Sequence, residues 1–168
     1  MIRPGWQLAW RSDDTGIEVH EQRMPGYVRA RVSGQPNGPG AVVWAEEDGR
    51  VVFIGIDRPA IGARLLELPR GGAEAEDADA VATARRELLE ETGLRAGEVA
   101  LVGTIWPDSG LLADSVAVVR AHDLAAGGVA EFPDLRWLTA DEIDSAVASG
   151  EIRDGITLSA IALVRARR

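Results

Sequence analysis

The 168-residue chain contains no cysteine, which excludes a disulfide framework. It also has no run of about 18 consecutive apolar residues, so no segment is expected to span a membrane. Its first residues, from Met1 to Trp6, lack the apolar stretch of a signal peptide. Together these absences predict a cytoplasmic protein without a membrane partner.

Positive charge is also scarce, because 18 basic residues face 27 acidic ones and the formal net charge is −9. Such a charge repels a nucleic-acid backbone, which argues against a general DNA or RNA binder. It would repel a diphosphate as well, unless bound metal and a few placed arginines reverse the local field. The length and the 46% share of hydrophobic residues fit one compact domain with a substantial core.

The most informative segment that is present runs from Arg86 to Leu94, where three glutamates share one strip of a predicted helix. At about 100° per residue, Glu87, Glu90 and Glu91 fall within an arc of about 100°. Because glutamates at these spacings repel one another by roughly a few tenths of a kcal/mol per pair, the strip is either a solvated face or a cation site. An all-oxygen cluster suits Mg²⁺, which often shares its remaining positions with substrate phosphates.

The residues upstream of this helix complete a longer motif, since Gly71 stands in a Pro-Arg-Gly-Gly turn and an acidic loop leads from it to Arg86. Together they resemble the Nudix box of the Nudix hydrolases. The family pattern is Gly, five residues, Glu, seven residues, Arg-Glu, an apolar residue, any residue, Glu-Glu, any residue, Gly and an apolar residue. The second half matches at every fixed position, but the loop has one extra residue. Counting from Gly71 reaches Asp77 in place of the first Glu, whereas counting back from Arg86 reaches Ala78.

The resemblance implies a metal site. By analogy with the family, Glu87, Glu90 and Glu91 would hold Mg²⁺, with Mn²⁺ as an alternative. The main-chain carbonyl of Arg70, just before the box glycine, would be a further ligand. Arg86 would orient a glutamate through a charge-assisted hydrogen bond and belongs, with Glu87 and Glu91, to the expected catalytic set.

A second resemblance bears on the substrate, because residues 58–71 are similar to the lead-in of ADP-ribose and ADP-sugar pyrophosphatases within the Nudix family. Residues 149–158 resemble a later segment of the same subgroup. The likeness implies that Arg58 and Glu67 hold the nucleotide, and Arg64 and Arg70 lie near enough in sequence to be considered with them. The expected reaction is metal-dependent hydrolysis of the diphosphate linkage of ADP-ribose or a related ADP-sugar to AMP and a sugar phosphate.

The general base is expected on a loop well after the box, where the resemblance points to Glu131. Asp134 and Asp114 compete for the role, and a plain solvated carboxylate is the alternative interpretation of Glu131. Two other functions stay open. One is Nudix hydrolysis of another nucleoside diphosphate derivative, such as a dinucleotide, a coenzyme A ester or a damaged nucleotide. The other is a low-activity binding module with this fold, which the altered acidic loop motivates.

Periodicity and turn signals predict an α+β chain. Strands are expected at residues 17–22, 27–32, 41–45, 51–56, 65–68, 100–105, 115–121 and 135–138, and helices at residues 79–92, 139–150 and 155–168. With the resemblance, these elements imply a Nudix-type α/β/α sandwich with a mixed central sheet and a small N-terminal antiparallel strand layer.

A loop rich in glycine and proline, residues 34–40, separates an N-terminal strand segment (residues 1–40) from the expected Nudix hydrolase domain (residues 41–168). In the ADP-sugar subgroup such strands often exchange between two protomers, so the resemblance implies a homodimer. Trp6 and Trp10 lie in this segment and are candidates for stacking on a base, or for core or dimer contacts.

Overall fold

A mixed sheet forms the centre of the protein in the computed structural model, which describes residues 5–167. Its strands follow the order β10-β5-β4-β9-β8, with β6 paired to β5 and β7 paired to β4. The strand bounds are β4 Gly40–Glu47, β5 Arg50–Arg58, β6 Ala63–Glu67, β7 Arg70–Gly71, β8 Leu94–Ile105, β9 Val116–Ala126 and β10 Arg136–Leu138. Strands β4 and β9 are parallel, and their neighbours pair antiparallel. The predicted mixed sheet is therefore confirmed.

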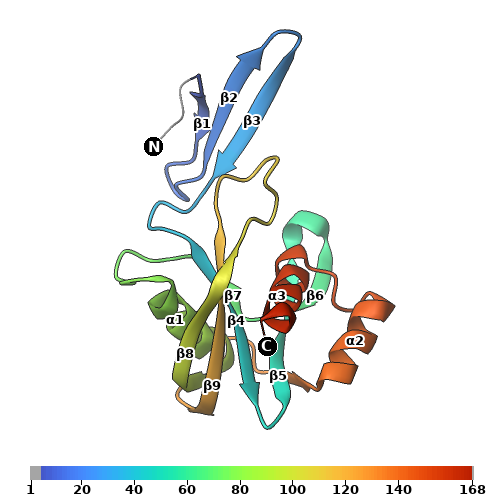
Figure 1. Ribbon diagram of the computed structural model, residues 1–168. Helices are drawn as coiled ribbons and strands as arrows, with labels where there is room; N and C mark the ends of the chain where they lie inside the picture. The colour runs from blue at the N-terminus through green and yellow to red at the C-terminus, as the bar shows by residue number, and fades with distance from the viewer. Residues whose placement is uncertain (1–4, 168) are drawn as a thin grey trace.

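Helices cover both faces of this sheet (Figure 1). They are α1 (Ala80–Thr92), α2 (Ala140–Ser149) and α3 (Gly155–Ala166), and a short 3-10 helix spans Pro59–Ile61. Because side chains alternate along a strand, β4 serves two cores. Val42 and Trp44 pack with α2 and α3, whereas Ala41 and Val43 pack with α1. The result is the predicted three-layer α/β/α sandwich.

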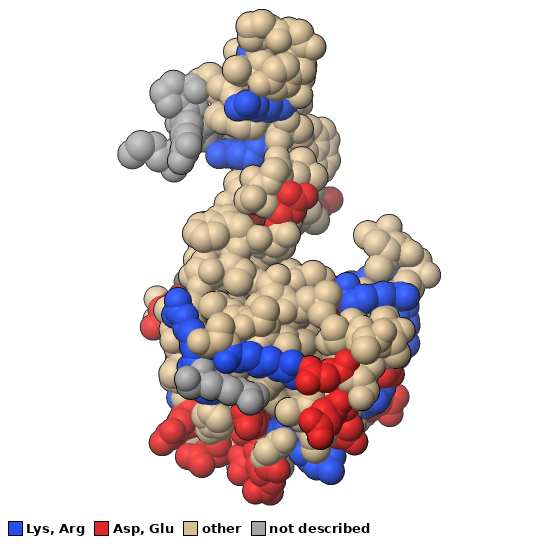
Figure 2. All heavy atoms as spheres, turned by 45° about the vertical axis from the view of Figure 1, so that its right-hand side comes forward, with Lys and Arg blue, Asp and Glu red and all other residues tan. Residues whose placement is uncertain are grey.

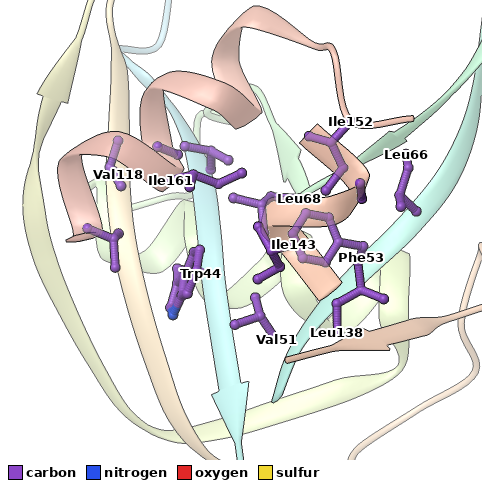
Figure 3. Close-up of a cluster of buried hydrophobic side chains, with 14 of the residues drawn as sticks. Trp44, Val51, Phe53, Leu66, Leu68, Val118, Leu138, Ile143, Ile152 and Ile161 are labelled. Atoms are coloured by element: carbon purple, nitrogen blue, oxygen red, sulfur yellow. The ribbon is translucent and has the colours of Figure 1, made fainter. Parts of the chain in front are cut away.

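The larger core lies between the sheet and the two C-terminal helices (Figure 3). Trp44 and Phe53 from the strands meet Ile143 of α2 and Ile161 of α3, and all four are almost fully buried. The α1 side is built from smaller residues, so the box helix packs close to the strands. This close packing places the acidic strip of α1 beside the end of β7.

The N-terminal residues form a separate antiparallel sheet that projects from the body (Figures 1 and 2). Its strands are β1 (Gln7–Arg11), β2 (Glu18–Met24) and β3 (Tyr27–Ser33), in that order. Val32 connects it to the body, since its amide donates to the Leu111 carbonyl and its carbonyl accepts from Ala113. Several large apolar side chains of this sheet are about half exposed, namely Leu8, Trp10, Tyr27 and Val28.

The structure differs from the sequence-based expectation mainly at element boundaries. Strand β8 begins at Leu94, six residues earlier than expected, and β1 and β7 were not predicted. The early part of β8 carries small and charged residues without clear alternation, and only its pairing with β9 makes it a strand. Every residue of β1 is exposed, so β1 has no buried face to leave a pattern. No helix among residues 5–167 has the length and apolarity needed to cross a membrane.

Candidate active site

The acidic helix α1 lies directly against the short strand β7. Asp79 caps its first turn by accepting from the amides of Val81 and Ala82, and Gly93 ends it at φ +70°. The Arg70 amide donates to Oε2 of Glu91 at 2.8 Å. A Cβ atom at Gly71 would lie 2.1 Å from Oε1 of Glu87, so only glycine permits this approach.

The three glutamates of the strip differ in their exposure. Glu87 and Glu91 are buried, at 9% and 7% exposed, whereas Glu90 faces solvent. Arg86 donates through Nη1 to Glu87 at 2.8 Å and to Glu90 at 2.9 Å. Arg86 is therefore bound to two of the three glutamates that the resemblance suggests as metal ligands.

The loop before the helix is tied to the same arginine. Arg86 Nη2 donates to Oδ2 of Asp77 at 3.0 Å and to the carbonyl of Gly72 at 2.6 Å. The hydrogen bond from Arg86 lowers the pKa of Asp77. Because Asp77 contacts Arg86, we align Asp77 with the first acidic position of the family pattern, which is the position reached by counting from Gly71. The extra residue of the loop is then the exposed Ala78 that follows it.

Burial dominates the electrostatics of the two inner carboxylates. It raises the pKa of Glu91 to about 7, and although the Arg70 amide opposes this shift, the charges of Glu87 and Glu131 add to it. Burial also raises the pKa of Glu87, against the effect of Arg86. Desolvated carboxylates that repel one another are stabilised by a cation, and oxygen donors of this kind suit Mg²⁺.

The carboxylate oxygens of these glutamates suit a divalent cation chemically, but the described side chains do not surround a common point. Within residues 5–167, no three acidic or histidine side chains converge in the manner of a complete metal site. The exposed Glu90 is held by Arg86 at the edge of the strip. The structure thus brings Glu91 to the main chain of Arg70 and Glu87 to that of Gly71, and leaves Glu90 at the rim.

A second charged cluster surrounds Glu67, which is fully buried at the end of β6. Arg58 donates to both of its oxygens, at 2.9 and 2.7 Å, and Arg70 Nε donates to Oε2 at 2.9 Å. The hydrogen bond to Glu67 raises the pKa of Arg58. A buried carboxylate with these partners positions two guanidinium groups, and the side chains of both arginines remain partly exposed.

Asp154 also belongs to this cluster, although it is not among the site residues predicted from the sequence. Its Oδ1 lies 3.4 Å from Arg70 Nη2, and its Oδ2 caps α3 by accepting from the Thr157 amide at 2.8 Å. Thr157 Oγ1 in turn accepts from the Leu68 amide at 3.2 Å. The pattern Asp-x-x-Thr before an apolar run was the available signal, because such residues cap helices.

Of the three candidate bases, only Glu131 lies at the acidic helix. Its amide donates to the Glu90 carbonyl at 2.8 Å, and its side chain is exposed. Asp114 instead accepts from the Gly34 amide, between the N-terminal sheet and the body. Asp134 lines a surface cavity of about 450 Å³ together with Arg64. Arg64 pairs with Asp57 at 3.3 Å and takes no part in the Glu67 cluster.

The fold and this box helix together define a class of hydrolase with a mixed sheet between helical layers. Residues 35–157 match the family described as NUDIX domain, so the chain belongs to the Nudix family and is a Nudix hydrolase. It is 29% identical over 151 residues to the ADP-ribose pyrophosphatase of Mycobacterium tuberculosis (strain ATCC 25618 / H37Rv). The matched stretch covers 86% of this chain and 73% of the relative.

A solved structure described as "Crystal structure of ADP compounds hydrolase" superimposes with a TM-score of 0.76. The match covers 96% of this chain and 90% of the other, at 17% sequence identity. At this identity the likeness shows that the two proteins share a fold.

Proposed function

We propose that this protein hydrolyses the diphosphate linkage of ADP-ribose or a related ADP-sugar, yielding AMP and a sugar phosphate. The observation that carries the proposal is the adjacency of two charged groups. Buried Glu91 accepts from the main-chain amide of Arg70, buried Glu87 lies against Gly71, and the side chain of Arg70 joins the Arg58–Glu67 pair. A site for a cation is thereby placed next to arginines suited to phosphate oxygens. The 29% identity to an ADP-ribose pyrophosphatase supports the choice of substrate class.

The proposed metal ligands are Glu87, Glu90, Glu91 and the main-chain carbonyl of Arg70. Mg²⁺ or Mn²⁺, when bound there, would neutralise phosphate oxygens and lower the pKa of a bound water. Glu91 is kept in place by the Arg70 amide, and Glu87 by Arg86.

The remaining roles fall to side chains around this pair. Glu131, on its exposed loop, accepts the proton of the attacking water as general base. Arg58 and Arg70 bind the diphosphate, and the buried Glu67 holds both guanidinium groups in position. When the diphosphate is held between the arginines and the glutamates, its scissile bond is oriented toward the attacking water.

We further propose that residues 1–40 form a strand segment that exchanges between two protomers of a homodimer around the domain of residues 41–168. The half-exposed Trp10, Tyr27 and Val28 on the projecting sheet support this, because isolated sheets rarely leave such side chains uncovered. A cavity of about 430 Å³ lies between Trp6 and Trp106, beside Arg31, and offers a surface on which a base would stack. Light scattering coupled to size exclusion tests the dimer, and a monomer throughout the working concentration range would refute it.

The altered acidic loop was the reason to consider a low-activity binding module. Asp77 of this loop still pairs with Arg86, so the loop gives little support to that hypothesis. The test of function is a panel of ADP-ribose, ADP-glucose, a dinucleotide, a coenzyme A ester and an oxidised nucleotide, run with Mg²⁺ and then with Mn²⁺. Product identification should give AMP and ribose 5-phosphate from ADP-ribose, and Glu131→Gln should lower kcat by about 100-fold or more. Turnover of another diphosphate in preference to both ADP-sugars, or of none, would refute the assignment.

A further inference from the structure

The loop of residues 127–132, which carries the proposed base, is attached to the C-terminal end of the box helix. The amides of Gly127 and Gly128 both donate to the Gly93 carbonyl, at 2.8 and 3.1 Å. The Glu131 amide donates to the Glu90 carbonyl at 2.8 Å. The Phe132 amide donates to the Glu91 carbonyl at 3.0 Å. The last carbonyls of a helix have no partner within it, and here a distant loop supplies the donors.

Charge does not explain this attachment. The C-terminal end of a helix carries partial negative charge, which disfavours an acidic side chain nearby. Glu131 is nevertheless held there, and the amide of the next residue, Phe132, donates to the main-chain carbonyl of Glu91. Main-chain hydrogen bonds therefore determine the position of this loop against an unfavourable field.

The attachment depends on the absence of a side chain at Gly93. A Cβ atom at Gly93 would lie 2.8 Å from the Gly128 carbonyl oxygen and 3.1 Å from the Ala130 amide nitrogen. Both are backbone atoms of the loop, so the loop would have to move. Gly93 also ends α1 at φ +70°, but helix termination alone does not require free space beside it.

Gly150 provides a control within the same chain. It ends α2 in the same left-handed conformation, at φ +77°, and its amide donates to Val147. A Cβ atom at Gly150 would meet nothing within 4 Å. The two glycines share the role of ending a helix and differ in whether a loop is seated against them.

We propose that Gly93 is a positioning residue that seats the 127–132 loop on the end of α1 and so holds Glu131 beside the metal-binding carboxylates before substrate arrives. The inference rests on the proposed role of Glu131 as general base. The site is then assembled before substrate binds, and the box glycine Gly93 acts through the loop as well as through the helix.

The first test compares Gly93→Asn with Gly150→Asn. Asparagine tolerates the left-handed conformation better than other side chains, so both variants keep their helix ends. We expect kcat for ADP-ribose to fall on the order of 100-fold in Gly93→Asn, with KM within about threefold, because general-base catalysis is lost while binding is kept. Gly150→Asn should stay within about twofold of wild type in both constants. Equal effects of the two substitutions would overturn the proposal.

A double-variant cycle tests whether Gly93 acts through Glu131. If it does, Gly93→Asn combined with Glu131→Gln should have the same kcat as Glu131→Gln alone, within about twofold. Multiplication of the two losses would show that Gly93 acts on the helix carboxylates instead, and would overturn the proposal.

Amide hydrogen exchange of the ligand-free wild type tests the seating without any turnover. The amides of Glu131 and Phe132 should exchange far more slowly than that of Val129, which is 94% exposed in the same loop. Exchange as fast as that of Val129 would refute the seating, even if Gly93→Asn does not fold. Protected amides in a protein that cleaves no ADP-sugar would instead refute the proposed function alone, so the two failures are distinguishable.

Discussion

Replacing Glu91 by glutamine should make the metal-free protein more stable at alkaline pH, although it removes a proposed metal ligand. Glu91 is 7% exposed, and burial is the main cause that raises its pKa to about 7 from an ordinary value of 4.5. The folded state therefore holds a proton that the unfolded chain releases at lower pH. The stabilisation that protonated Glu91 contributes is fully present below pH 4.5 and is lost as the pH rises through about 7.

The size of the effect follows from the same pKa. With about 1.4 kcal/mol for each pKa unit, an ionised Glu91 destabilises the folded state by up to about 3.5 kcal/mol above its folded pKa. A glutamine side chain carries no charge at any of these pH values, and its carbonyl oxygen can accept from the Arg70 amide as the carboxylate does. The variant should therefore exceed wild type in unfolding free energy by about 3 kcal/mol near pH 8, and by little near pH 4.5.

Urea unfolding followed by tryptophan fluorescence, in the presence of a chelator, measures this difference across the pH range. Glu98→Gln is the matched control, because Glu98 is an exposed glutamate on β8, and its unfolding free energy should stay within about 0.5 kcal/mol of wild type. Added Mg²⁺ should stabilise wild type by mass action and leave Glu91→Gln unchanged. A variant that follows the wild-type curve at every pH would refute the assignment of Glu91 as a desolvated carboxylate.

Four further outcomes are expected. Asp77→Ala should lower the unfolding free energy by about 1 kcal/mol in urea titrations near pH 7, because Arg86 loses a charged partner but keeps others; an unchanged midpoint would contradict this. Deleting Ala78, which restores the family spacing from Asp77, should leave kcat/KM within about tenfold, or about 1.4 kcal/mol of barrier, and a larger change would show that the loop has another role. Arg58→Ala should raise KM for ADP-ribose by about tenfold or more with kcat within about threefold, since the lost contact is to bound substrate; a fall in kcat alone would argue against that role. Removing divalent ions with a chelator should abolish turnover, and Mg²⁺ should restore it.

The sequence by itself determined the features that depend on neighbouring residues. The helices observed at Ala80–Thr92 and Ala140–Ser149 were predicted to within one residue at each end, because capping and helical periodicity act over three or four residues. The sandwich was also predictable, because its buried strands are short apolar runs bounded by turn signals. The Nudix box identified the family for the same reason, since its spacing reflects one loop and one helix.

Only the tertiary structure decided which distant groups meet. It made Asp77 rather than Glu74 the closest carboxylate of the acidic loop to Arg86, because the path of the loop sets that contact. It brought Asp154 to Arg70 and the Glu131 loop to the end of α1, across separations that leave no local pattern. It also separated the glutamate strip into two buried carboxylates and one exposed carboxylate, because packing against β7 covers only part of that helix face. Local sequence specifies which side chains share a helix, whereas the packing of the layers specifies what each of them contacts.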